Sequence, residues 1–275
     1  MHSHWLETPQ HIAKYRQGSI LLSIDRHAIA RLGYYGGMTS RPTLLNYIDS
    51  PEQALDSERD LLASVVAGER DTALSFWSTQ QSIVVPRRLS KNSAFDSAKR
   101  LSQQRGWPVM LRESGGDATP QGGGVINVTY AHICDQHPPI ADSYRTLCAP
   151  IVRLVEGFGQ SGSCQSVSGS FCDGDYNVVC HQRKLAGTAQ RRSRRRGRGS
   201  SAVLFAHALI LVNADIAGSV DAINRFYEDC DQPASIDAGA HINLAEIAAT
   251  AGLLDTEDVV QLLQRDYLAL LADPH

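Results

Sequence analysis

The sequence predicts an α/β protein of the α+β type, with a mixed central β-sheet flanked by helices. Its composition is that of a globular protein with a sizeable core, because 43% of the 275 residues are apolar and 20% are charged. Strand-like and helix-like segments interleave along the chain. Several strand-like segments also follow one another directly, which favours a mixed sheet over strict alternation of strands and helices.

The helices are predicted from end signals and apolar periodicity. Residues 57–68 start with Ser57 and further polar residues, then turn apolar and end at Gly68, as in a capped helix. A helix over residues 93–105 stops at Gly106. Further helices are predicted at residues 140–158, 220–227, 244–251 and 256–271.

The strands are predicted from short runs of apolar residues between turn formers. They are residues 73–77, 82–85, 109–112, 125–130, 176–181, 184–191 and 202–211. Residues 1–50 give no clear pattern beyond an apolar run at 20–24 and the turn formers Gly33, Gly36 and Gly37.

Charge, hydropathy and cysteine usage exclude several classes of protein. A net charge of −3 argues against a polyanion-binding chain. No stretch reaches the roughly 20 consecutive apolar residues of a membrane helix, and the N-terminus lacks the pattern of a secretion signal. Six cysteines in a chain of 275 residues do not make a disulfide scaffold, and the lack of a CxxC pair argues against a structural zinc site. We therefore expect a cytoplasmic protein with reduced thiols, no membrane association and no metal.

A glycine-rich segment, residues 112–124, connects two predicted strands. Glycines allow close approach of the backbone to a ligand, and successive N–H groups can bind a phosphate or a carboxylate. The spacing matches neither a P-loop nor a dinucleotide-binding motif. Taken alone, such a segment is more often a flexible connection between strands.

A second segment combines Cys172, at a turn before a strand, with Lys184 at the start of the next strand. Loop thiols near backbone N–H groups or a cation are the reactive kind. Small residues follow Lys184, so a ligand could lie against that strand, and the lysine could stabilise an acyl oxyanion. Singly, the cysteine would be interpreted as a packing residue and the lysine as a surface residue. Together with the glycine-rich segment, they predict a site.

Three motifs, in this order, resemble those of the lipoate–protein ligase and lipoyl/octanoyl transferase superfamily. Residues 112–117, RESGGD, are similar to its R-x-[ST]-G-G-G loop. Residues 184–190, KLAGTAQ, resemble its K-[IVLF]-[SA]-G-x-[AS]-Q element, and Asn213 and Asp215 resemble its N-x-D segment after an apolar strand. The resemblance implies the catalytic-domain fold of biotin and lipoate protein ligases.

The domain organisation follows from this resemblance. A single catalytic domain is expected over residues 1–275, with the family core at 57–216. Residues 1–56 form an N-terminal segment without a predicted structure, and the helices at 217–275 are expected to be decoration outside the site.

Within the superfamily, residues 170–178, SFCDGDYNV, resemble the S-[FY]-C-x-G-x-Y-D-L pattern of the octanoyl-[glycine cleavage H protein] amidotransferases. This implies that Cys172 is the acyl-carrying nucleophile, that Lys184 binds the acyl carbonyl, and that the glycine-rich segment walls the acyl tunnel. The implied substrate-binding residues are Arg112, Ser114, Gly115, Gly116, Asp117, Gln121, Asn127, Gly187, Ala189 and Gln190.

The implied activity is transfer of an octanoyl or lipoyl group, through a cysteine thioester, to a lysine of a lipoyl domain or of glycine cleavage H protein. An acyl carrier protein is an alternative donor, and no cofactor is needed. A second interpretation is a lipoate–protein ligase that uses ATP and Mg²⁺. Such ligases have an arginine, a glycine and a histidine where this chain has Leu111, Asp117 and Gln121, which argues against ATP use.

A third interpretation is a non-catalytic homologue that binds acyl groups or carrier proteins. Asp117 motivates it, as do Asp173 and Asp175 beside the thiol, because carboxylates raise a thiol pKa unless they point away. None of the histidines adjoins Cys172 in sequence. His181 is interpreted as a strand surface residue, His207 as a core residue, and His132 and His137 as non-ligands on either side of Cys134.

An arginine-rich run, residues 191–199, lies between two apolar strands and is expected to be a hairpin loop. A solvated loop is the favoured interpretation. Docking of an acidic lipoyl domain comes second, because a basic loop beside the site would attract it. Nucleic-acid binding is a distant third, since no aromatic platform accompanies the arginines.

Overall fold

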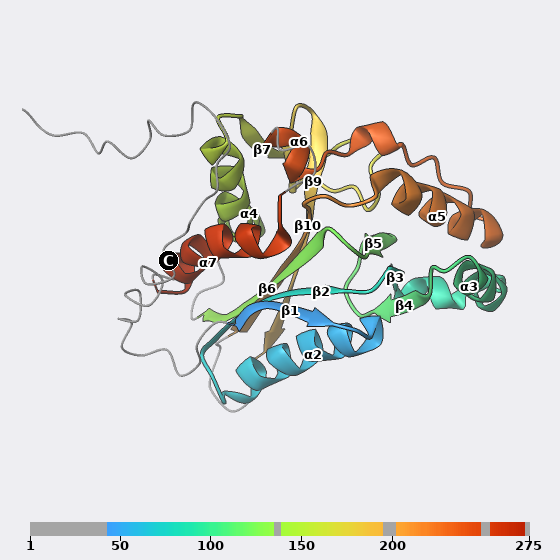
Figure 1. Ribbon diagram of the computed structural model, residues 1–275. Coiled ribbons are helices and arrows are strands. Elements are labelled where there is room, and N and C mark those ends of the chain that lie inside the picture. Colours follow the sequence, from blue (N-terminus) through green and yellow to red (C-terminus); the bar gives the residue numbers. More distant parts are fainter. Residues whose placement is uncertain (1–42, 135–138, 195–201, 249–253, 273–275) are drawn as a thin grey trace, which may run out of the picture. The chain divides into compact units, whose positions relative to one another are not determined.

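The computed structural model describes residues 43–134, 139–194, 202–248 and 254–272. The apolar run at 20–24, the glycines near residue 36, the N-terminal residues, His137 and loop residues 195–199 lie outside the described part. That part contains a seven-stranded mixed sheet and a three-stranded sheet, with helices packed against them (Figure 1). The predicted fold class is therefore confirmed.

The elements have the following bounds. The helices are α2 (Pro51–Ala67), α3 (Phe95–Gln104), α4 (Ile140–Gly157), α5 (Ile216–Asp229), α6 (Leu244–Ile247) and α7 (Thr256–Ala272), with 3-10 helices η1 (Arg87–Lys91) and η2 (Ala238–Ala240). The strands are β1 (Thr43–Ile48), β2 (Thr72–Thr79), β3 (Ser82–Pro86), β4 (Val109–Arg112), β5 (Thr119–Gln121), β6 (Val125–Cys134), β7 (Gly162–Gln165), β8 (Asn177–Cys180), β9 (Arg183–Arg194) and β10 (Ala202–Leu211).

The large sheet has the strand order β1-β2-β6-β10-β9-β8-β7, and the small sheet has the order β4-β3-β5. In the large sheet β1 runs parallel to β2, and the other neighbours are antiparallel. The register places two rows of residues side by side across β9, β10 and β6. One row is Gly187, Leu209 and Asn127, continued by Trp77 on β2, and the next is Ala189, His207 and Thr129.

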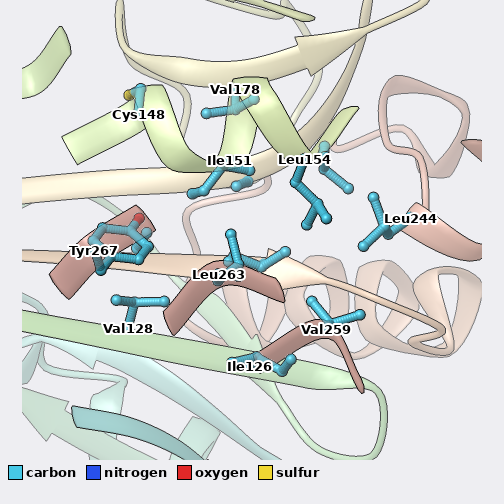
Figure 2. Packing of buried hydrophobic residues seen from close by; sticks show 14 of the residues in the cluster. Ile126, Val128, Cys148, Ile151, Leu154, Val178, Leu244, Val259, Leu263 and Tyr267 are labelled. Atoms are coloured by element: carbon cyan, nitrogen blue, oxygen red, sulfur yellow. The ribbon is translucent and has the colours of Figure 1, made fainter. Parts of the chain in front are cut away.

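One face of the large sheet is covered by α4 and α7 (Figure 2). Alternate residues of β6, such as Ile126 and Val128, point to this face and pack with Ile151 of α4 and Leu263 of α7. Each such side chain removed from water contributes about 1.5–3 kcal/mol to folding. The only polar atom of the buried Tyr267 side chain, its hydroxyl, donates to the Leu147 carbonyl at 2.9 Å.

The opposite face is covered in two places. Near one end, α2 packs Leu62 and Val65 against Ala131 and Phe205 of the sheet. Elsewhere, a second core joins the small sheet, α3 and α5 to Leu209 and other residues of the large sheet. The two rows of residues described above lie on this face, between the two coverings.

Helix α2 begins earlier than the sequence predicted. Pro51 occupies its first turn, where a missing N–H does no harm, and Ser50 is the N-cap, accepting from the Gln53 N–H at 3.3 Å. The predicted start at Ser57 was therefore wrong, whereas the predicted end at Gly68 is confirmed, with φ 80°. The longer helix extends over the sheet and brings Leu55 to the site described below.

Four further predictions need correction. The glycine-rich segment contains a strand, β5, instead of being a loop throughout, and the short edge strands β1 and β7 were not predicted. His181 lies in a tight turn between β8 and β9, with φ 50°, and contacts Gln160 instead of a strand neighbour. Strand β9 extends to Arg194, so Arg191 and Arg192 belong to the hairpin strand. Of the described helices, none has the length and hydropathy required to span a membrane.

Candidate functional site

A pocket with a cavity volume of about 60 Å³ opens over the two rows of sheet residues. Its floor is formed by β9, β10, β6 and β2, and its walls by α2, the small sheet and the loop before β8. The lining residues are Leu55, Glu58, Trp77, Val84, Arg112, Thr119, Gln121, Asn127, Phe171, Cys172, Lys184, Gly187, Thr188, Ala189, His207, Ala208 and Leu209. The pocket therefore brings the glycine-rich segment and the Cys172–Lys184 segment together, as the sequence predicted.

The Cys172 thiol lies where these two segments meet. Its Sγ accepts from the Asp117 backbone N–H at 3.2 Å and lies 3.8 Å from Arg112 Nη2. A Cβ atom on Gly116 would lie 2.6 Å from Sγ, so only glycine leaves room for the sulfur there. Cys172 itself has φ 45°, a left-handed conformation that is uncommon outside glycine and typical of functional positions.

Arg112 holds the glycine-rich segment in the shape that meets the thiol. Its Nη2 donates to the carbonyls of Gly115 and Asp117, at 2.9 and 2.6 Å, and its Nη1 donates to the Val84 carbonyl at 2.9 Å. Burial lowers the pKa of Arg112, and the neighbouring Cys172 opposes that shift. The Tyr227 hydroxyl, on α5, accepts from the Ala118 N–H at 2.9 Å and so stabilises the glycine-rich segment.

Lys184 is only 1% exposed and stabilises the Cys172 loop through hydrogen bonds. Its Nζ donates to the carbonyls of Phe171 and Cys172, at 2.6 and 2.9 Å. Burial lowers the pKa of Lys184 to about 8, although the nearby Cys172 acts in the opposite direction. An ammonium has three donors, so one remains for a group in the pocket. Gly187 leaves the space for this side chain, because a Cβ there would lie 3.2 Å from Nζ.

The Asp173 carboxylate points away from the thiol. Its Oδ1 accepts from the N–H groups of Val167 and Gly174, each at 2.8 Å, and from Asn177 Nδ2 at 2.7 Å. The carboxylate therefore shapes the turn that carries Cys172. Asp173 motivated a non-catalytic interpretation because it is adjacent to Cys172 in sequence. Its carboxylate is instead directed to the Val167, Gly174 and Asn177 donors.

The opposite end of the pocket holds a buried polar cluster around Glu58. Its Oε1 accepts from Thr129 Oγ1 at 2.6 Å and from Trp77 Nε1 at 3.3 Å, and its Oε2 lies 3.6 Å from His207 Nδ1. Burial alone would raise the pKa of Glu58, but His207 and these hydrogen bonds outweigh it and leave the pKa lowered. His207 lines the pocket, so its interpretation as an ordinary core residue was wrong.

Gln121 and Asn127 form part of the pocket wall as a paired set of amides. Gln121 Nε2 donates to Asn127 Oδ1 at 3.0 Å, and Asn127 Nδ2 donates to Gln121 Oε1 at 2.7 Å. Both side chains are buried. Because each amide satisfies the other, the wall presents a fixed hydrogen-bonding surface to a ligand.

The other predicted binding residues lie partly in the pocket and partly outside it. Gly187 and Ala189 line the pocket floor, and Ser114 lines an adjoining cavity that also contacts Glu58 and His207. Gln190 points to the opposite face of β9 and donates to the Ile140 carbonyl at 3.0 Å, so its assignment to the pocket was wrong. The alternation of side chains along a strand explains this, since Ala189 and Gln190 must face opposite ways.

Sequence reasoning missed several residues of the site. Glu58 was part of a predicted helix start, yet Ala54 and Leu62, four residues on either side, are both buried and place it on the buried face of α2. That spacing was the available signal. Tyr227 and His241 come from the C-terminal region, which had been interpreted as decoration, and they contact the two loops of the site. That interpretation was wrong, and nothing in the local sequence indicated these long-range contacts.

Solved structures of similar fold include lipoate ligases. A bipartite lipoate protein ligase of Thermoplasma acidophilum has a TM-score of 0.62 at 16% identity, over 85% of this chain and 84% of that one. A lipoate-protein ligase A bound with ATP has a TM-score of 0.62 at 15% identity, over 85% of this chain and 86% of that one. These likenesses support the fold.

Sequence relatives extend the comparison. A protein of Cupriavidus necator without a described function is 33% identical over 76% of this chain and 87% of its own length. An octanoyl-[GcvH]:protein N-octanoyltransferase of Kyrpidia tusciae is 29% identical over 76% of this chain and 73% of its own length. The family model of the lipoyl protein ligase A/B catalytic domain matches residues 50–267. The chain therefore belongs to the lipoyl protein ligase A/B catalytic-domain family.

Proposed function

We propose that the protein transfers an octanoyl or lipoyl group from an acylated glycine cleavage H protein to a lysine of a lipoyl domain, through a thioester on Cys172. The observation that carries the proposal is the position of the Cys172 thiol. It lies at the pocket, on the Asp117 N–H and near Arg112. The names of relatives such as the Kyrpidia tusciae octanoyltransferase support the same reaction and the same donor.

In the first step, the Cys172 thiolate attacks the carbonyl carbon of the donor's acyl-lysine amide. A carbon–sulfur bond forms, the carbon–nitrogen bond breaks, and the proton lost by the thiol is returned to the leaving amine. The negative charge that develops on the acyl oxygen needs donors in a buried site. The third proton of Lys184 Nζ is a candidate donor, since the other two are used by the Cys172 loop.

In the second step, the neutral amine of a lipoyl-domain lysine attacks the thioester carbonyl. The carbon–nitrogen bond of the new amide forms as the carbon–sulfur bond breaks, and the thiol is regenerated. An acyl carrier protein could supply the acyl group by the same chemistry, with a sulfur leaving group in place of the amine.

The pocket is suited to a medium-length acyl chain. The row Gly187, Leu209 and Asn127 crosses three adjacent strands, which spans about 10 Å at the usual spacing between strands. Leu55 and Val84 add apolar surface to the walls along this path. An acyl group bound to Cys172 would therefore extend across the sheet toward Glu58.

Transfer of this kind needs neither ATP nor Mg²⁺, and two contacts favour it over the ligase alternative. The Asp117 carboxylate pairs with Arg88 at 2.6 Å, and the Gln121 amide is occupied by Asn127. Both positions differ from the ligase pattern, and both side chains already have partners within the protein. We therefore propose that no nucleotide is required.

The test is an acyl-transfer assay without nucleotide. Octanoylated H protein and an unmodified lipoyl domain are incubated with the enzyme, and the mass of the lipoyl domain is followed. We expect a gain of one octanoyl group with the wild type, none with Cys172→Ala, and wild-type transfer with the matched control Cys164→Ala. Loading from free lipoate that requires ATP and Mg²⁺, and survives Cys172→Ala, would instead assign the protein to the ligases. Carrier binding without any turnover would assign it a non-catalytic role.

A further inference from the structure

His241 lies in the C-terminal region, between η2 and α6, yet it is packed beside the start of β9. It is 1% exposed, and the next residue, Ile242, donates its N–H to the Lys184 carbonyl at 3.0 Å. The Arg183 guanidinium also donates to the His241 carbonyl, at 3.3 Å. The backbone around His241 is therefore attached to the strand that carries the buried lysine.

The His241 side chain contacts the residue before the thiol. Its ring stacks on Phe171, with ring centres 4.3 Å apart and an angle of 16° between the planes. Its Nε2 lies 3.1 Å from the Phe171 backbone nitrogen, and its Nδ1 lies 3.0 Å from the Asp237 carbonyl oxygen. Burial, and then the neighbouring Lys184, lower the pKa of His241 to about 4. The neutral ring thus donates from Nδ1 to Asp237 and accepts at Nε2 from Phe171.

These contacts hold the Phe171 residue at both of its backbone groups. Its N–H is bound by His241 and its carbonyl by Lys184 Nζ. The following residue is Cys172, whose left-handed conformation with φ 45° persists only where the surroundings impose it. That conformation places the sulfur on the Asp117 N–H.

We propose that His241 is a positioning residue for Cys172, which acts through the Phe171 backbone to keep the thiol against the Asp117 N–H. The functional consequence rests on the proposed thioester chemistry, but the positioning itself is a property of the free enzyme. The His241 ring contacts Phe171 and Asp237, and the proposed role requires no contact with substrate or with the sulfur. Its effect is expected on the reactivity of the Cys172 thiol, in protein that remains folded.

The test compares His241→Gln with His241→Met. Both side chains are unbranched and similar in length, but only glutamine offers an oxygen that can accept the Phe171 N–H. The protein is treated with iodoacetamide, and the alkylation rate of Cys172 is measured by peptide mass spectrometry. The alkylation rate of Cys164 on β7, measured in the same digest, is the internal reference. We expect the ratio of the two rates to fall at least tenfold in His241→Met and at most threefold in His241→Gln. His181→Met, at an exposed turn, should leave the ratio unchanged.

Equal ratios in folded His241→Met and wild-type protein would overturn the proposal and leave His241 a packing residue. If His241→Met does not fold, hydrogen exchange of the Phe171 amide in the wild type decides instead. Protection comparable to that of β9 amides is expected, and exchange at the rate of an exposed loop amide would overturn the positioning role. Neither measurement involves an acyl donor, so failure of the proposed transfer reaction is seen separately, in the lipoyl-domain assay.

Discussion

The two ends of the pocket are built in different ways. At the thiol end, loops hold the sulfur: the Asp117 N–H and the Arg112 guanidinium contact it, and the Lys184 ammonium binds the Cys172 carbonyl. Cys172 itself has a left-handed backbone. At the far end, Glu58 and His207 project from a helix and a strand, with 3.6 Å between Glu58 Oε2 and His207 Nδ1. The thiol end offers the cationic donors of Arg112 and Lys184 to a developing anion, whereas the far end offers a buried polar surface.

Under the proposed mechanism, this difference would separate the chemical step from substrate selection. Changes at the thiol end should act on the rate of acyl transfer to sulfur, because they alter groups that meet the reacting atoms. Changes at the far end should act on the binding of the acyl chain.

After removal of the thiol itself, the largest effect is expected for Lys184→Met at the thiol end. The substitution removes the donors to the Phe171 and Cys172 carbonyls and the remaining proton for the acyl oxygen. Loss of an oxyanion donor typically costs about 10²–10³-fold in rate, and we expect a fall of roughly 10³-fold because the loop support is also lost. Single-turnover transfer of the octanoyl group to Cys172 measures it. A fall of less than tenfold would show that the lysine only fills space.

The second prediction concerns the pH dependence of stability. The pKa of Lys184 is lowered from 10.5 to about 8 in the folded protein, so folding disfavours the protonated form. The destabilisation caused by burying the protonated lysine is fully present below about pH 8, and it disappears as the pH rises toward 10.5, the pKa of lysine in the unfolded chain. The lowered pKa corresponds to on the order of 3 kcal/mol of folding free energy. Urea unfolding between pH 7 and 10 should therefore show a rise in stability that is missing in Lys184→Met. Parallel curves for the two proteins would contradict a buried, lowered lysine.

A third and smaller effect is expected for Gly116→Ala. A Cβ atom there would lie 2.6 Å from the Cys172 sulfur, and Gly116 has φ 89°, where alanine is strained by about 1–2 kcal/mol. We expect the rate of thioester formation to fall roughly 30-fold, with the acyl-donor KM nearly unchanged. Gly115→Ala is the matched control, since a Cβ there meets nothing within 4 Å. Equal rates for the two variants would show that the sulfur is not confined by this loop.

The smallest effect is expected for Glu58→Gln at the far end. Glutamine keeps an acceptor for Thr129 and Trp77 but removes the charge that faces His207. We expect KM for the octanoyl donor to change by about threefold to tenfold while kcat stays within about twofold, as for a group that acts on binding alone. Steady-state kinetics with octanoyl and lipoyl donors measure both constants. A large loss of kcat at unchanged KM would contradict the assignment of the Glu58 end to binding of the acyl chain.

The same comparison explains what the sequence could predict. Residues of the thiol end occur in contiguous motifs, so Cys172, Lys184 and the glycine-rich segment were found from local patterns together with the resemblance to the family's motifs. The partners of that end were not, because Tyr227 and His241 reach it through tertiary contacts that span 109 and 70 residues.

The far end was missed for a different reason. Glu58 is a charged residue on an otherwise ordinary helix, and its burial depends on how α2 packs over Trp77. The interleaving of helices and strands predicted the mixed sheet. The short strands β5 (Thr119–Gln121) and β7 (Gly162–Gln165) lack the apolar run by which β4 and β8, of similar length, were predicted. Strand β1 becomes recognisable only through its parallel pairing with β2.

The central claim is that Cys172 carries the acyl group, and the intact mass of the enzyme tests it most directly. The protein is incubated with octanoylated H protein, or with octanoyl acyl carrier protein, in the absence of ATP. We predict one octanoyl adduct that hydroxylamine removes and that is missing in Cys172→Ala. The absence of an adduct with either donor, combined with ATP-dependent loading of a lipoyl domain from free lipoate, would contradict the claim.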